Sequence, residues 1–416
     1  MNLPEIIGIL SIILLYLSIK KPKVFIVFVY LLYEIFYQIV ANYQLTRIFG
    51  SIKPIDLMII IAFIGIILTR NYKRSFNLKF FLAFVFLNIY EILIGTTKFG
   101  QMGIGEPRVY VLSCIFIIYI LAKIKLNDIE FIVKGIILTG LIIALIAIIW
   151  FFSNLILQGK LIRPFGAAQA LSVMIAFILF NGFFKNRLNR NLNILINVIF
   201  IIGILVLQHR SVWVAFFVSL IILLYTQGKL IKLLPKLLII IFSIILIHIL
   251  LKQNQYYQVF LNEIEYRLTF ARTGITEDTS GYFRILAWKA EFNKFSQNPI
   301  LGSGWGNLRL LHPTRGLLTV HIHNGHLTLL SRTGVIGYLF FILFVMQIVL
   351  KNRYIQVLYL NIAIIGTLVY SFFYPFVLSL WILMGLSLLL DYFLRNNEIR
   401  LLNVSYSNEV FKKAIV

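Results

Sequence analysis

Long apolar runs separated by short polar segments follow one another along almost the whole chain. Runs long enough to cross about 30 Å of hydrocarbon as helices recur from end to end, and the runs are too long and too uniformly apolar for the alternating strands of a membrane β-barrel. Because backbone groups in lipid must hydrogen-bond internally, each run is expected to be helical. The predicted spans are 4–19, 24–40, 54–69, 78–95, 109–122, 131–152, 168–184, 191–207, 211–226, 233–251, 326–350, 355–373 and 375–393. The sequence therefore predicts an all-α, polytopic membrane bundle of about 12–13 transmembrane helices.

The composition agrees with a membrane protein. Hydrophobic residues make up 60% of the 416 residues, and the mean hydropathy is +0.93. We interpret the first run as a retained helix, because residues 1–5 carry no basic side chain and no small-residue cleavage site follows Ile19. The single cysteine, Cys114, lies in a predicted span, which excludes a disulfide framework or a thiolate metal site within the chain.

The net charge of +23 suggests a nucleic-acid partner, but the positions of the basic residues argue against one. They concentrate in alternate connections between spans, as the positive-inside rule predicts for cytoplasmic loops. The N-terminus and the long loop 252–325 are then outside, and the C-terminus is inside. We therefore assign the charge to orientation and to contact with membrane lipids, and we exclude nucleic acid. The basic connections are 20–23, 70–79, 123–134, 185–190, 229–236, 351–353 and 395–413.

Only one segment outside the predicted spans is large, which suggests four parts: an N-terminal transmembrane bundle (1–251), an outward-facing loop containing short helices (252–325), C-terminal transmembrane helices (326–394) and a cytoplasmic tail (395–416). In the loop, apolar residues at helical spacing predict a helix from Tyr282 to Phe295, with Glu291 on a polar face. The glycine-rich segment 302–306 follows. Its glycines permit positive φ angles and close approach to a ligand, although an ordinary surface turn explains them equally well.

Four ionisable side chains are predicted to lie at the outer face beside this loop. They are Arg163, Arg210, Arg284 and His323. A single arginine at the end of a transmembrane helix often only extends its charged group to the membrane–water interface. An ionisable group near lipid is nevertheless costly and marks a candidate functional site. Because four such groups from distant parts of the sequence are expected on one side, we favour a shared function.

The residue types indicate a chemistry. Guanidinium groups bind phosphate through forked, charge-assisted hydrogen bonds, which suits a lipid-linked diphosphate. An imidazole can take a proton from a sugar hydroxyl, and the positive end of a helix dipole near His323 favours its neutral form. We therefore predict transfer of a glycan from a lipid diphosphate to a hydroxyl, with His323 as general base and Arg210 and Arg284 as catalytic groups that stabilise the leaving diphosphate. Predicted substrate-binding residues are Arg163, Asn324, Gly304 and Trp305.

No cofactor is expected for this chemistry. The chain has no Asp-x-Asp pair and no phosphate-binding Gly-x4-Gly-Lys-Ser/Thr loop, so a nucleotide sugar or ATP is not the expected substrate. A zinc site formed by His321, His323 and His326 is the competing interpretation, but the spacing is not a helical i, i+4 pair and no Cys or Asp completes it. The remaining histidines are expected to have interface or packing roles: His209, His248 and His312.

The motif His323-Asn324-x9-Gly334-x2-Gly337 resembles the histidine signature of the O-antigen ligase and polymerase family of bacterial membrane proteins. Three further segments resemble that family in the same order along the chain. They are Arg163-Pro164-Phe165-Gly166, Gln208-His209-Arg210-Ser211 with Ala215, and Arg284 through Trp288 to Pro299 with Gly302, Gly304 and Gly306. Residues 167–169 depart from the Asn-Pro-Asn-like element of many members, which puts a specific role for Arg163 in doubt.

The resemblance implies a metal-independent enzyme that inverts the anomeric centre of an undecaprenyl diphosphate-linked glycan. It implies roles for Arg210, Arg284 and His323, and a site on the outer face of the bacterial inner membrane. The acceptor glycolipid is left open. We favour a polysaccharide polymerase, to which a chain-length regulator can be a further partner; a ligase that transfers the glycan to lipid A core remains the alternative. A flippase for lipid-linked oligosaccharides is the non-enzymatic alternative, although the charged candidates lie at one face rather than at mid-membrane.

Overall fold

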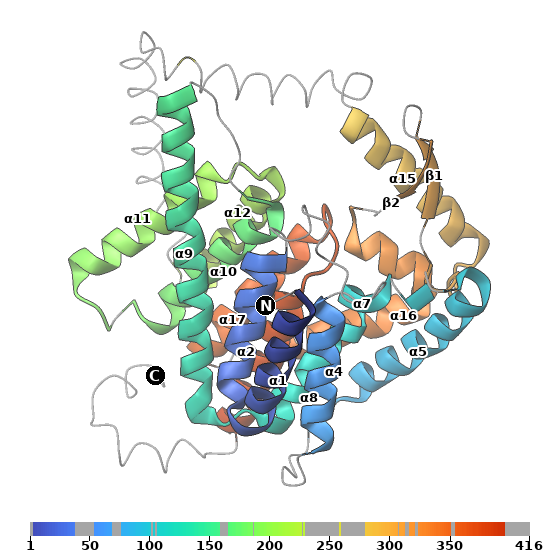
Figure 1. Ribbon diagram of the computed structural model, residues 1–416, viewed down its shortest axis with the longest axis horizontal. Coiled ribbons are helices and arrows are strands. Elements are labelled where there is room, and N and C mark those ends of the chain that lie inside the picture. The colour runs from blue at the N-terminus through green and yellow to red at the C-terminus, as the bar shows by residue number, and fades with distance from the viewer. Residues whose placement is uncertain are drawn as a thin grey trace.

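The computed structural model is a bundle of apolar helices with a further helix and a hairpin at one end (Figure 1). The structure describes residues 3–37, 54–68, 76–100, 103–104, 106–158, 165–185, 187–226, 228, 258, 279–306, 308–312, 316–320, 323–350 and 354–395. In the first half of the chain the elements are α1 (Leu3–Lys20), α2 (Pro22–Leu31), the π-helix η1 (Leu32–Tyr37), α4 (Pro54–Ile67), α5 (Lys79–Phe99), α7 (Pro107–Tyr110), the 3₁₀-helix η2 (Leu112–Cys114), α8 (Ile115–Lys123), α9 (Leu126–Gln158) and α10 (Ala167–Phe183). They are followed by α11 (Arg190–Val206), α12 (Arg210–Thr226), α15 (Thr279–Gln297), α16 (Gly325–Val349), α17 (Ile355–Tyr370) and α18 (Leu378–Arg395).

The predicted all-α membrane bundle is confirmed. Each predicted span within the described residues coincides with helical structure, and the span at 233–251 lies outside them. Four of the described helices are long and apolar enough to cross a membrane by themselves, and the others are shorter apolar helices. The protein is a multi-pass membrane protein. The four long helices are Lys79–Phe99, Leu126–Leu157, Gly325–Val349 and Leu378–Arg395.

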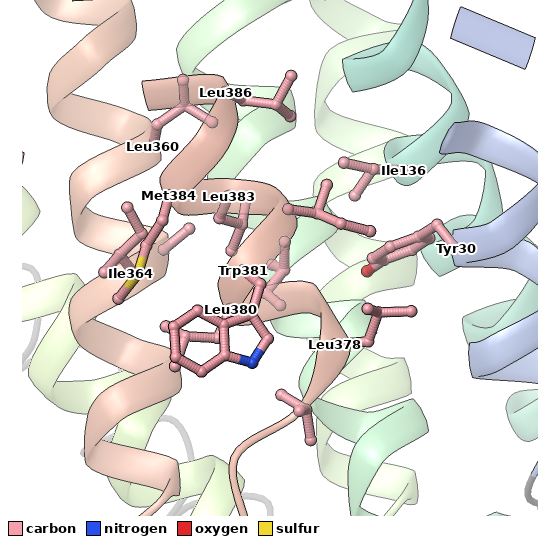
Figure 2. Close-up of a cluster of buried hydrophobic side chains, with 14 of the residues drawn as sticks. Tyr30, Ile136, Leu360, Ile364, Leu378, Leu380, Trp381, Leu383, Met384 and Leu386 are labelled. Atoms are coloured by element: carbon pink, nitrogen blue, oxygen red, sulfur yellow. The ribbon is translucent and has the colours of Figure 1, made fainter. Parts of the chain in front are cut away.

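Helix α18 lies at the centre of the bundle. Nearly all of its residues are buried, including the polar side chains of Ser379, Ser387 and Asp391. It packs against α8, α9 and α17. Figure 2 shows its side chains between Leu360 and Ile364 of α17 on one side and Tyr30 and Ile136 on the other. The C-terminal helices therefore share one core with the N-terminal helices, and the four-part division stays a prediction about the sequence.

The large loop contains a β-hairpin as well as a helix. Helix α15 spans the predicted helix and ends before Asn298-Pro299, as expected. Strands β1 (Leu308–His312) and β2 (Gly316–Val320) then pair antiparallel. The prediction of short helices alone was therefore incomplete. Two short apolar runs flanking a turn with proline and glycine were the signal that could have revealed the hairpin.

Candidate functional site

Helix α16 is broken at Gly334, the first glycine of the histidine motif. Its φ of 63° and ψ of −173° are not helical. A break frees backbone groups, which must find partners where a helix lies in a membrane. Here the N–H of Val335 donates to the carbonyl of Pro299 at 2.8 Å, and that of Ile336 to Ile300 at 3.3 Å. The break is therefore completed by the loop that follows α15.

The glycine-rich segment 302–306 makes the reciprocal contacts. The backbone N–H of Ser303 donates to Ser331 at 3.0 Å, and that of Gly304 to Arg332 at 3.2 Å. A Cβ on Gly302 would lie 2.3 Å from the Arg332 carbonyl oxygen, so only glycine fits there. The close approach that we predicted for a ligand is thus made to the backbone of α16.

We expect Gly334→Ala to destabilise the fold more than Gly100→Ala. Both glycines have positive φ, which costs an alanine about 1–2 kcal/mol. At Gly100 an added Cβ meets no described residue within 4 Å, whereas at Gly334 it would lie 2.1 Å from the Ile300 carbonyl oxygen. Thermal unfolding of the purified variants in detergent measures the difference. Equal melting temperatures would show that the loop does not press on the break.

A buried ion cluster fastens α15 and α7 to the same turn of α16. Arg332 is fully buried, and its guanidinium forms a forked pair with Glu106 at 2.9 and 2.8 Å. A third guanidinium nitrogen donates to Glu291 of α15, whose side chain is also fully buried. Glu106 in addition accepts the backbone N–H of Gly306 at 2.7 Å. The amphipathic pattern placed Glu291 on a polar face, which is wrong because its partner lies in another helix.

The charges in this cluster depend on one another. Burial raises the pKa of the Glu291 carboxyl, and the Arg332 guanidinium opposes that shift. Burial, followed by repulsion from Arg332, lowers the pKa of Lys294 on α15 to about 8. Lys294 therefore loses its proton at a lower pH than an exposed lysine does. Removing Arg332 would leave two carboxylates poorly compensated.

Trp305 and Gly304 lie inside this packing arrangement. The Trp305 side chain is fully buried, and its indole N–H donates to Asn88 of α5 at 3.1 Å. A Cβ on Gly95 would lie 1.8 Å from the Trp305 carbonyl oxygen, so the loop also lies directly on α5. In this conformation the Trp305 side chain is occupied by protein contacts. Substrate binding by these two residues stays a prediction.

His323 and Asn324 stand at the first turn of α16. The Asn324 side chain caps the helix by accepting the N–H of Leu327 at 2.9 Å. The half-buried His323 ring lies edge-on to Tyr374, with the ring centroids 5.5 Å apart. Gly325 donates to the carbonyls of Ser371 and Tyr374 at 2.7 and 3.0 Å. The loop after α17 therefore fixes the position of His323.

His326 has a different environment. Its ring nitrogens hydrogen-bond the hydroxyl of Tyr338 at 3.1 Å and the carbonyl of Leu368 at 2.9 Å, and the ring stacks on Phe372. Both nitrogens are thus engaged in packing. His321, the remaining member of the alternative zinc site, lies outside the described residues. Within the described part of the chain no three His, Cys, Asp or Glu side chains are grouped to hold a metal ion.

Arg210 is the first residue of α12, where it is exposed at a tight turn from α11. Gln208 in this turn has a φ of 55°, which is unusual for a residue other than glycine. The neighbouring His209 ring nitrogen Nε2 lies 3.0 Å from the carbonyl oxygen of Phe165. Arg163, two residues before Phe165, is outside the described residues. The hydrogen bond nevertheless joins two segments that the sequence singled out separately.

A buried polar group connects these helix ends. Glu34 lies in the π-helix η1 and is 1% exposed; its backbone carbonyl accepts the Gln169 side chain of α10 at 2.7 Å. Near the end of α17, a Cβ on Gly366 would lie 2.4 Å from the Ser219 hydroxyl of α12 and 2.8 Å from Met174 of α10, and Tyr370 stacks on Tyr374 with the ring centroids 5.0 Å apart. From Tyr374 the contacts continue to His323. The start of α10, the end of α17 and the start of α16 therefore meet at one end of the bundle.

A comparison of the sequence with models of known protein families finds a match that includes this end of α16. The O-antigen ligase family matches residues 195–342 of this chain. The matched region is therefore similar to an O-antigen ligase domain. A comparison with curated proteins finds no match. The match confirms the resemblance to the O-antigen ligase and polymerase family noted from the histidine motif, and it supports a membrane enzyme of that general type.

The matched region begins in α11 and ends in α16, so it includes Arg210, Arg284 and His323. Arg210 stands at the start of α12 and His323 just before the start of α16, and α17 packs against both of these helices. Arg284 lies on α15, which packs against α16. Sequence reasoning missed Glu34, Glu106 and Arg332. Their signal was an ionisable residue in or next to an apolar run, which is costly in lipid and therefore informative.

Proposed function

We propose that this protein is a surface-polysaccharide polymerase that transfers a glycan from undecaprenyl diphosphate to an acceptor sugar at the outer face of the inner membrane. The observation that carries the proposal is that the end of α17 lies against both site elements: Tyr374 contacts His323 at the start of α16, and α17 packs against α12, which begins with Arg210. A base and a diphosphate-binding group near one another are what such a transfer needs.

The proposed reaction is a direct displacement. His323 takes the proton from an acceptor hydroxyl as that oxygen forms a bond to the anomeric carbon of the donor glycan. The bond between the anomeric carbon and the diphosphate oxygen breaks, and its electron pair stays on the diphosphate. Arg210 and Arg284 stabilise the developing negative charge. Attack opposite to the leaving group inverts the anomeric centre.

Product analysis tests the proposal. Purified protein is incubated with an undecaprenyl diphosphate-linked repeat unit, with and without a lipid A core acceptor, in detergent and in the presence of a chelator. A ladder of lengthened lipid-linked glycan without the core is expected. Transfer only when the core is present would make the protein a ligase, the function after which the matched family is named. Absence of any glycosidic product would favour transport.

We expect Arg210→Ala and Arg284→Ala each to lower turnover by about 10²- to 10³-fold, and the lysine variants to recover little of it. The reason is that a lysine carries the charge but cannot form the two-pronged contact with a diphosphate. Arg190→Lys is the matched control for Arg210→Lys, because Arg190 is also the exposed first residue of a helix, α11. Full activity of Arg210→Lys would reduce the role of Arg210 to simple charge.

A further inference from the structure

A groove of 420 Å³ lies between α15 and the first turn of α16. It is lined by Ile285, Trp288, Lys289, Phe292, Asn293 and Leu327. Its volume falls within the range of sites that bind small molecules, about 300–1,000 Å³. The five lining residues of α15 lie on successive turns of one helix face. The neighbouring face of α15, which includes Ala287 and Glu291, is buried instead.

The groove combines apolar surface with a few polar groups. Trp288 and Phe292 supply aromatic surface, and Phe292 is 57% exposed although it is a large apolar side chain. Lys289 and Asn293 supply hydrogen-bonding groups at the same site. Among the residues that the structure describes, the buried indole N–H of Trp288 has no hydrogen-bond partner, and an unpartnered buried donor is costly. A ligand with an apolar face and hydroxyl oxygens at its edge would match this set.

These groups distinguish a sugar from a lipid tail. A pyranose ring has a C–H face that packs on aromatic side chains, and its hydroxyls accept and donate hydrogen bonds. An isoprenoid chain would cover the apolar surface, but it offers no acceptor to Trp288, Lys289 or Asn293. Tryptophan is suited to the sugar because it joins a large apolar surface to one polar N–H.

The groove is next to the predicted reacting groups. Leu327, which lines it, receives the cap of Asn324 and follows His323 by four residues. Trp288 follows Arg284 by one helical turn on α15. A ligand in the groove would therefore lie between the elements that carry the predicted base and one predicted diphosphate group.

We propose that this groove is a binding subsite for a sugar ring of the transferred or accepting glycan, with Trp288, Lys289 and Asn293 as specificity-determining contacts. The inference rests on the proposed function and names a part of its substrate site. It predicts that the protein recognises glycan separately from the lipid diphosphate.

Binding of a lipid-free probe tests the subsite. The probe is the repeat-unit oligosaccharide of the surface polysaccharide made by the cells that express this protein, and binding to the full chain in detergent is followed by saturation-transfer NMR and calorimetry. We expect Trp288→Ala to weaken binding by about tenfold or more. Trp288→Phe and Asn293→Ala should weaken it less, and Gln297→Ala, an exposed residue on α15 outside the groove, should not change it.

Each result decides the proposal. Failure of the wild-type protein to bind the oligosaccharide would overturn it. So would binding by Trp288→Ala, Trp288→Phe and Asn293→Ala as tight as that of the wild-type protein. So would the loss of undecaprenyl phosphate binding in these variants with oligosaccharide binding unchanged, because the groove would then hold the isoprenoid. Product formation from the lipid-linked donor is measured separately. If the wild-type protein makes product but does not bind the oligosaccharide, the subsite alone is refuted. If it binds the oligosaccharide in the groove but makes no product, the proposed function alone is refuted.

Discussion

His323→Ala is expected to lower turnover by about 10²- to 10⁴-fold while leaving binding of the lipid diphosphate largely intact. The range is that of general acid–base catalysis by a positioned side chain. His323 stands just before α16, half-buried against Tyr374, and α17 packs against both α16 and α12, the helix that begins with Arg210. Steady-state kinetics with lipid-linked donor, together with donor binding measured by calorimetry, separates loss of chemistry from loss of affinity.

His326→Asn provides the contrast for this experiment. The His326 ring is buried and hydrogen-bonded to Tyr338 and Leu368, so its loss should lower the melting temperature more than the turnover of the folded molecules. His323→Ala should show the opposite pattern. Unchanged turnover in His323→Ala would remove this residue from the mechanism, and the base would have to be sought among other groups at the same end of the bundle.

Arg332→Met is expected to destabilise the protein by about 3–5 kcal/mol, because it leaves charged partners buried without compensation. Arg332 and Glu291 are both fully buried, and Glu106 is 9% exposed. The triple variant Arg332→Met, Glu106→Gln, Glu291→Gln removes the charges together and should recover much of the loss. Thermal unfolding in detergent compares the single and triple variants.

Arg187→Met is the matched control for the arginine substitution. Arg187 pairs with Glu130 at 2.7 Å, but the two side chains are 39% and 42% exposed. An exposed pair of this kind contributes about 1 kcal/mol or less, so the melting temperature should hardly move. If Arg332→Met lowered the melting temperature as little as Arg187→Met, the buried cluster would not be what holds α15 and α7 to α16.

Local sequence was sufficient to predict the helices. Hydropathy and length decide whether a segment crosses a membrane, and both can be read from consecutive residues. The helix from Tyr282 to Phe295 was predicted from its spacing and from Asn298-Pro299, and it forms as α15. The histidine motif likewise needed only the order of His323, Asn324 and the two glycines. The resemblance to the matched family therefore followed from the order of residues along the chain.

Tertiary structure alone decided which side chains those helices bring together. Arg332 finds Glu106 across 226 residues of sequence, so no local pattern could pair them. The glycines at 302–306 look like a ligand-binding turn in isolation, yet the structure uses them to approach the backbone of α16. The groove lined by Trp288 could not be predicted from the sequence either, because it forms where α15 meets α16. The sequence by itself determined the helices and the resemblance to the matched family, since those depend on neighbouring residues, whereas the buried charges and the shape of the site depend on contacts between distant residues.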